Sequence, residues 1–153
     1  MPTSADAPDD VTLTRVLARA STIAVVGASP NPERTSHQIA LWIMQNTPYE
    51  VFLVNPRGGD SDILGHGFFD DLASLPVVPD IVDVFRAPDH VPDVAVDAIE
   101  AGAGTLWLQL GIRHDAAALL AHQAGMDVIQ NRCFKVEYRR LAEHIEAARA
   151  VRK

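Results

Sequence analysis

The sequence of 153 residues contains a single cysteine, Cys133, and no apolar run approaching the ~20 residues needed to cross a bilayer. One cysteine cannot form an intramolecular disulfide, which excludes a disulfide-stapled scaffold. The first ten residues, MPTSADAPDD, are acidic and polar, whereas a secretory signal peptide is basic and then apolar. We therefore expect a cytoplasmic protein that does not enter a membrane.

Positive charge is also scarce, with 13 Lys and Arg against 20 Asp and Glu and a formal net charge of -7. Binding a polyanion requires a clustered cationic face, so no general affinity for nucleic acid or anionic membranes is expected. An anionic ligand must instead be held by a local site. The six histidines show neither HExxH spacing nor a paired-cysteine partner, so no metal site is predicted.

What the chain does contain is a regular alternation of short apolar runs and amphipathic stretches. Residues 1–9 lack periodicity and are predicted to form a flexible leader, and residues 10–153 a single domain. Buried parallel strands are expected at 22–26, 51–54, 81–85, 106–108 and 128–129. Helices are expected at 11–20, 37–46, 91–102, 115–125 and 136–152, the fourth with Asp115 as its cap.

This alternation predicts an α/β fold, a Rossmann-like three-layer sandwich with a mostly parallel five-stranded sheet. Residues 55–79 carry no pattern for a long helix and receive no element in this scheme. In an open parallel sheet, ligands bind beyond the carboxyl ends of the strands. Four arginines follow the second to fifth strands there: Arg57, Arg86, Arg113 and Arg132.

The loop after the first strand, VVGASPNPERTS, has one glycine where a dinucleotide fingerprint has three. It still has the means to bind phosphate, because Gly27 permits close approach of the backbone and the next helix presents its N-terminal N–H groups. Ser29 and Ser36 add hydroxyls, and Arg34 adds a positive charge. Alternatively, the prolines only fix the chain and Ser36 only caps a helix.

The loop after the second strand reads Asn55-Pro56-Arg57, where an NAD-binding domain usually has Asp or Glu to bind the ribose 2′-hydroxyl. Arginine at this place favours a phosphate on the adenosine ribose, which indicates NADP or a nucleotide with a 3′-phosphate. Alternatively, Arg57 is a solvated turn residue.

Together the segments VVGASPNPERTS, VFLVNPRG, DIVDVFRAPDHV, LWLQLGIRH and NRCFKVEYRRL resemble the small CoA-binding proteins related to the nucleotide-binding module of the succinyl-CoA synthetase alpha subunit. The resemblance covers about residues 22 to 141 and implies a single Rossmann-like domain that binds coenzyme A. It implies that Gly27, Ala28 and Ser29 meet the phosphates, and that Pro56 and Arg57 lie at the adenosine 3′-phosphate. Further implied contacts are a wall of Phe85, Arg86 and Ala87, and a pantetheine border of Gln109, Gly111 and Ile112.

No residue is assigned a catalytic role. His114 is either a base near the CoA thiol or a partner of the local backbone, and Cys133 either exchanges with that thiol or packs as a small apolar side chain. The basic cluster Arg132, Lys135, Arg139 and Arg140 is expected on a solvated helix face. We thus expect binding of CoA or an acyl-CoA without established catalysis, in a sensor, carrier or regulatory protein. An NADP-linked reductase and a protein-interaction module with a vestigial nucleotide pocket stay open as alternatives.

Overall fold

The computed structural model describes residues 9–152. The leader predicted for residues 1–9 lies outside the described residues except for Asp9, whose carboxylate accepts the backbone N–H of Thr12 at 2.8 Å and caps the first helix. The elements are α1 (Asp10–Arg19), β1 (Thr22–Val26), α2 (Thr35–Asn46), β2 (Glu50–Val54), η1 (Pro56–Gly58), β3 (Asp62–Ile63), β4 (His66–Phe69), η2 (Leu72–Ser74), β5 (Ile81–Val84), η3 (Pro88–His90), α3 (Val91–Ala101), β6 (Thr105–Leu108), α4 (Asp115–Gln123), β7 (Asp127–Ile129) and α5 (Phe134–Arg152).

The strands form one sheet in the order β3-β4-β2-β1-β5-β6-β7, which confirms the α/β prediction. All neighbours are parallel except β3, which is antiparallel to β4. Without β3, numbering the strands along the chain gives 3-2-1-4-5-6, the order of doubly wound dinucleotide-binding domains. The strand order therefore reverses between β1 and β5.

The predicted count of five strands is wrong, because β3 and β4 arise in the segment left without an element. Their hairpin turns through two residues with positive φ, Leu64 at 50° and Gly65 at 81°, as a tight hairpin requires. β4 then joins β2 as a further parallel neighbour. A side chain at Gly58 would overlap the ring of Phe68, so η1 packs directly on this added strand. β3 and β4 are largely exposed or half-buried, so they lack the buried apolar run that marks the predicted strands.

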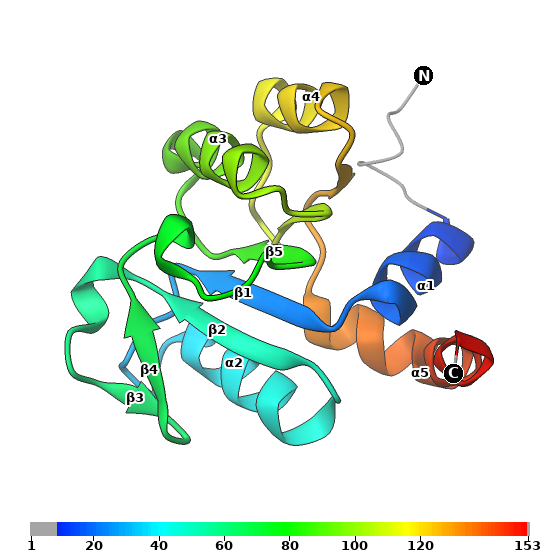
Figure 1. Ribbon diagram of the computed structural model, residues 1–153, viewed down its shortest axis with the longest axis horizontal. Coiled ribbons are helices and arrows are strands. Elements are labelled where there is room, and N and C mark those ends of the chain that lie inside the picture. The colour runs from blue at the N-terminus through cyan, green and yellow to red at the C-terminus, as the bar shows by residue number, and fades with distance from the viewer. Residues whose placement is uncertain (1–8, 153) are drawn as a thin grey trace.

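Helices cover both faces of the sheet, with α1, α2 and α5 on one side and α3 and α4 on the other (Figure 1). Every residue of β5 and β6 is buried, which explains why these strands are mostly apolar. Trp107 of β6 is fully buried, and its ring centroid lies 4.9 Å from that of Phe134 in α5. Trp42 makes an edge contact with Tyr138, so both tryptophans contribute to helix and sheet packing.

Helix ends follow the expected signals in some places and depart from them in others. Gly102 closes α3 in the left-handed conformation with φ 79°. The prediction of Asp115 as the cap of α4 is wrong: His114 is the cap, and its Nδ1 accepts the N–H of Ala117 at 3.1 Å. α2 and α5 each begin two residues before the predicted start. Over residues 9–152, no helix combines the length and the apolar character that crossing a bilayer requires.

Candidate functional site

The carboxyl ends of β1 and β5 meet at the point where the strand order reverses. Gly27, directly after β1, has φ 87°, and its N–H donates to the carbonyl of Val54 at 2.8 Å. A Cβ at Gly27 would lie 2.5 Å from the carbonyl oxygen of Phe85 and 3.0 Å from Cδ of Arg86. Glycine is therefore required both by the backbone conformation and by the close approach of the β5 loop. The predicted residues Gly27, Phe85 and Arg86 thus lie together.

The loop between β1 and α2 is held by its own side chains. The Ser29 N–H donates to Ser36 Oγ at 3.0 Å, and the Asn31 N–H donates to Ser29 Oγ at 3.1 Å. His37 Nδ1 lies 2.9 Å from the Ser29 carbonyl, so this nitrogen carries the proton and donates it. Both serine hydroxyls act as acceptors and keep their own O–H to donate. Ser36 is the second residue of α2 and is not its N-cap. Arg34 occupies the N-cap position, and its side chain makes no capping hydrogen bond.

The loop after β2 forms the short helix η1. Asn55 Oδ1 accepts the Arg57 N–H at 3.0 Å, and Asn55 Nδ2 donates to the Ala28 carbonyl at 2.9 Å. One amide side chain therefore joins the β1 loop to the β2 loop. Pro56 and Arg57 are exposed on this turn, so the Arg57 guanidinium extends into solvent at the sheet edge.

The loops after β6 and β7 use their polar side chains on each other. Gln109 is only 4% exposed, and its Oε1 accepts the N–H groups of Leu110 at 3.3 Å and Phe134 at 3.1 Å. The Gly111 N–H donates to Asn131 Oδ1 at 2.7 Å, and the Asn131 N–H donates to the Ile112 carbonyl at 3.2 Å. Of the expected pantetheine border, Gly111 is exposed and Ile112 half-buried, whereas Gln109 supports the start of α5.

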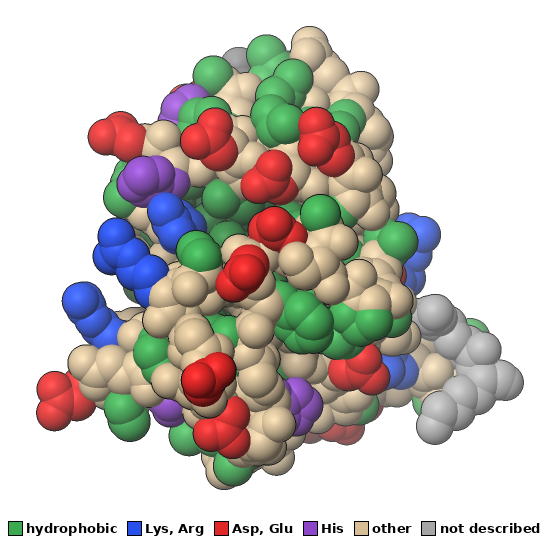
Figure 2. Space-filling view, turned by 60° about the vertical axis from the view of Figure 1, so that its left-hand side comes forward, with side chains coloured by type: hydrophobic (Ala, Val, Ile, Leu, Met, Phe, Trp, Pro, Cys, Tyr) green, Lys and Arg blue, Asp and Glu red, His purple; other side chains and the backbone are tan. Residues whose placement is uncertain are grey.

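The arginines that follow the strands at the carboxyl edge of the sheet fall into two groups. Arg113 pairs with Asp115 at 3.1 Å, and Arg132 pairs with Glu137 at 3.4 Å. Over residues 9–152, no carboxylate forms an ion pair with Arg34, Arg57 or Arg86. Figure 2, which brings the left side of Figure 1 forward, shows positive side chains gathered along one edge of this face, next to many acidic ones.

Of the basic cluster near the start of α5, Arg139 and Arg140 are exposed, as expected of a solvated helix face, while Arg132 and Lys135 are half-buried. Arg140 bonds Asp10 of α1 through both guanidinium nitrogens, at 2.9 and 2.8 Å, and also bonds Glu137 at 2.6 Å. These hydrogen bonds raise the pKa of Arg140. Arg132 bonds the same Glu137, and Lys135 lies 5.7 Å from the ring centroid of Trp42. Three members of the cluster therefore have partners within the protein, and Arg140 joins α5 to α1.

One cavity adjoins the carboxyl ends of β1 and β2, and a second lies beside α3 and the segment that leads into β5. The first cavity, of about 160 Å³, is lined by Pro56, Arg86 and His90, by four aspartates and by apolar side chains. The aspartates are Asp70, Asp71, Asp93 and Asp97. Asp71, Leu72 and Asp97 line both this cavity and the second one, which has a volume of about 490 Å³ and lies beside α3.

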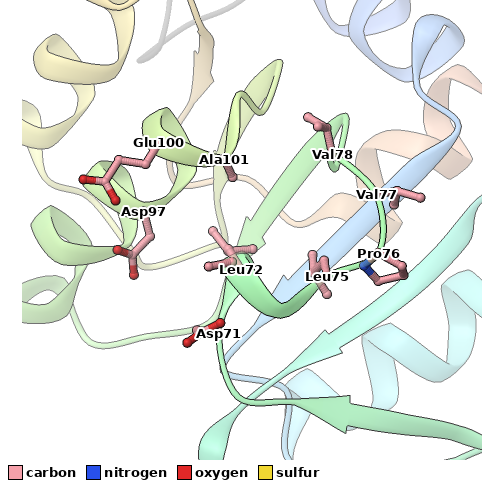
Figure 3. Close-up of a pocket in the computed structure, with 10 residues that line it drawn as sticks. Asp71, Leu72, Leu75, Pro76, Val77, Val78, Asp97, Glu100 and Ala101 are labelled. Carbon is pink, nitrogen blue, oxygen red and sulfur yellow. The ribbon is translucent and has the colours of Figure 1, made fainter.

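The larger cavity carries the wrong charge for a phosphate. Asp71, Asp97 and Glu100 line it together with apolar side chains such as Leu75 and Val78 (Figure 3). Burial, followed by the nearby carboxylates of Glu100, Asp93 and Asp71, raises the pKa of Asp97. Phosphates are therefore repelled from this cavity and are favoured near the arginines that follow β1, β2 and β5.

A carboxyl group lies buried just beneath the rim. Asp83 pairs with Val25 of β1 and Trp107 of β6, and two residues further along these strands come Phe85, Gly27 and Gln109. Asp83 is 0% exposed, and among residues 9–152 neither of its carboxyl oxygens has a hydrogen-bond partner. Complete burial raises the pKa of Asp83 well above its ordinary value, because the charged form is poorly solvated there.

Sequence reasoning missed the roles of Asn55 and Asp83. In the sequence, Asn55 indicates only that no acidic residue follows the second strand. Its hydrogen bond to Ala28 spans 27 positions, so no local pattern predicts it. Asp83 carried a visible signal, a charge within the apolar run Ile81–Val84, that was not used. His114 is used as the cap of α4, and Cys133 is half-buried before α5 and packs against the core.

Residues 21–139 match the family described as the CoA binding domain. The chain belongs to the CoA binding domain family. A family relative in Bacillus subtilis (strain 168), the uncharacterized protein YneT, is 34% identical over 131 residues, which is 86% of this chain and 95% of YneT.

Solved structures show the same fold. A Thermus thermophilus protein, cell-free ID.343, has a TM-score of 0.82 at 35% identity and covers 87% of this chain and 98% of its own. The dinucleotide-forming acetyl-coenzyme A synthetase 1 of Ca. Korarchaeum cryptofilum has a TM-score of 0.63 at 24% identity. The match covers 76% of this chain but 27% of the synthetase, so this likeness concerns the fold alone.

Proposed function

We propose that this protein binds coenzyme A or an acyl-CoA at the carboxyl ends of β1, β2 and β5. The observation that carries the proposal is the set of arginines Arg34, Arg57 and Arg86, which make no ion pair within residues 9–152 and stand beside the glycine loop of a CoA binding domain. On a chain with a net charge of -7, an anion must be held by a local group of positive charges such as these three. CoA carries a pyrophosphate and a 3′-phosphate, so two clusters of charge must be met.

The glycine loop is suited to the pyrophosphate. Gly27, Ala28 and Ser29 form a tight turn, and the first N–H groups of α2 have no partner within the helix. Backbone N–H groups at a helix start favour anions. Ser36 and Arg34, at this start, supply a hydroxyl and a positive charge. A Cβ at Gly27 would overlap the Phe85 carbonyl oxygen, so only glycine lets the β1 and β5 loops lie this close at the proposed phosphate site.

Arg57 is proposed to bind the 3′-phosphate, with Pro56 fixing the turn from which it extends. A guanidinium meets a phosphate with two parallel hydrogen bonds, which suits a terminal phosphate group. Phe85, Arg86 and Ala87 form the wall opposite, and the 160 Å³ cavity lined by Pro56 and Arg86 is proposed to take the uncharged adenosine. Its aspartates are acceptors for amino and hydroxyl groups rather than for phosphates.

The pantetheine arm is proposed to leave along Gly111 and Ile112, with Gln109 holding this loop from behind. The CoA thiol carries an acyl group when loaded, and no residue of this chain is assigned a step on it. His114 Nδ1 and Gln109 Oε1 are already engaged with the backbone. We therefore propose a carrier, sensor or regulatory protein rather than a catalyst.

Binding of NAD is disfavoured by Asn55. The place at the end of β2 where an acidic residue binds a ribose in NAD-dependent domains is taken by an amide whose two ends bond Ala28 and Arg57. NADP stays the closest competitor, because Arg57 suits its 2′-phosphate as well.

A thermal-shift panel of CoA, acetyl-CoA, dephospho-CoA, NADH and NADPH tests the proposal. A ligand present at 100 times its dissociation constant stabilises the folded state by about 2.7 kcal/mol. We expect CoA and acetyl-CoA to raise the melting temperature most, and dephospho-CoA less. Selective stabilisation by NADPH would assign the site to a reductase, and no shift with any nucleotide would favour an interaction module.

A further inference from the structure

Asn55, directly after β2, forms hydrogen bonds to two neighbouring segments of the protein and to its own loop. Its backbone N–H donates to the carbonyl of Phe69 in β4 at 2.9 Å. Its Nδ2 donates to the Ala28 carbonyl at 2.9 Å, and its Oδ1 accepts the Arg57 N–H at 3.0 Å. Its φ of -169° is ordinary extended backbone, so these bonds form without strain.

The two side-chain bonds require an amide. Asparagine alone among the small polar side chains offers a donor and an acceptor at the same reach. Aspartate would keep the bond from Arg57 but turn a carboxylate oxygen toward the Ala28 carbonyl, where two acceptors repel. Serine would still accept from a backbone N–H two residues on, as in a local turn, but is too short to bond Ala28 as well.

We propose that Asn55 is a positioning residue that sets the spacing between the glycine loop and Arg57 and so determines recognition of the 3′-phosphate. This inference rests on the proposed function. The glycine loop and Arg57 address two phosphate groups on one ligand, separated by a fixed length of nucleotide. A bond that joins both loops therefore keeps them at the separation that the ligand demands. Without it, Arg57 samples several positions, and the 3′-phosphate loses its preorganised partner.

Isothermal titration of CoA and dephospho-CoA into Asn55→Ala, Asn55→Ser and Asn55→Asp tests this role. The readout is the ratio of the two affinities, since dephospho-CoA lacks only the 3′-phosphate. Asn46→Ala is the matched control, because Asn46 Nδ2 donates to the Trp42 carbonyl at the same 2.9 Å, at the far end of α2. Each variant is first melted to compare its stability with the wild type.

We expect each Asn55 variant to lower the ratio about fivefold, the equivalent of one neutral hydrogen bond, and Asn46→Ala to leave it unchanged. In an Arg57→Ala background, loss of Asn55 should no longer alter the ratio, because the residue through which it acts is gone. The serine and aspartate variants cover the case in which the alanine variant does not fold.

The outcomes separate this inference from the proposed function. Wild-type protein that binds CoA, with Asn55 variants that weaken CoA and dephospho-CoA equally or not at all, would show Asn55 to be purely structural and would overturn the inference alone. Wild-type protein that does not bind CoA would overturn the proposed function and the inference with it.

Discussion

The two halves of the sheet edge have similar residue types and use them differently. At the ends of β1, β2 and β5, Arg57 and Arg86 form no ion pair within residues 9–152, whereas beyond β6 and β7 Arg113 and Arg132 are each paired with a carboxylate. The amide of Gln109, in the second half, accepts N–H groups of its own chain. A place after a parallel strand is therefore not enough to make a residue a ligand contact; its existing partners decide.

The largest effect is expected from Asp83 on β5, the strand at which the two halves meet, because an isolated buried charge is the costliest group in an interior. Its folded-state pKa is raised, so the neutral carboxyl stabilises the fold fully below its ordinary value of 3.8, and this stability is lost as pH rises through the raised pKa. Asp83→Asn does not titrate. Denaturant unfolding over a pH series should show wild type losing stability relative to Asp83→Asn as pH increases above about 4.

The prediction concerns the sign of the change with pH in the stability difference between wild type and Asp83→Asn. Parallel stability profiles for wild type and Asp83→Asn across the series would contradict it, and would mean that the carboxyl finds a partner in solution.

The next largest effect is a difference in unfolding free energy between alanine substitutions at Gly27 and Gly111. These glycines lie in different halves of the sheet edge and have the same φ of 87°. An added Cβ at Gly27 would lie 2.5 Å from the Phe85 carbonyl oxygen, while Gly111 has open space. Gly111→Ala should cost about 1–2 kcal/mol for the left-handed backbone, and Gly27→Ala about 1–3 kcal/mol more for the overlap. Equal losses of unfolding free energy would show that the β5 loop does not approach Gly27 closely.

Arg57→Ala sharpens the comparison by removing an unpaired charge. A charged hydrogen bond contributes about 1.5–3 kcal/mol, so CoA should bind roughly 10- to 100-fold more weakly. Stability should change by less than about 0.5 kcal/mol, since the side chain is exposed. Arg139→Ala, which removes an exposed arginine on α5, is the control and should leave calorimetric affinity unchanged. An Arg57→Ala protein that binds CoA as well as wild type would remove Arg57 from the site.

Gln109→Leu should do the reverse in the other half of the edge. It removes the acceptor for two backbone N–H groups, including that of buried Phe134, and should lower the unfolding free energy by about 2 kcal/mol. CoA affinity, measured on the folded variant, should change by less than about threefold, because the Gln109 side chain makes no direct contact with CoA in the proposed site. A large loss of affinity with unchanged stability would instead place the Gln109 side chain on the ligand.

The buried strands could be predicted from the sequence alone, but several side-chain roles could not. The runs at Thr22–Val26 and Ile81–Val84 are covered on both faces, so their apolar residues predict strands without knowledge of any neighbour. β3 and β4 are short and partly exposed, and their strand character depends on pairing with β2. Gly27 carries a local signal because turn geometry is local. Asn55 and Gln109 bond residues more than twenty positions away, so only the fold assigns their roles.

The most direct test of the central claim is an NMR titration of the amide resonances with CoA. The claim is that the phosphates bind the β1, β2 and β5 half, where Arg34, Arg57 and Arg86 form no ion pair with a carboxylate of the described residues 9–152. It predicts that the largest shift changes fall on residues 27–36, 55–58 and 85–87, with smaller ones at 111 and 112. Changes centred on residues 130–133, or at the opposite edge of the sheet around Gly104 and Gly125, would contradict it.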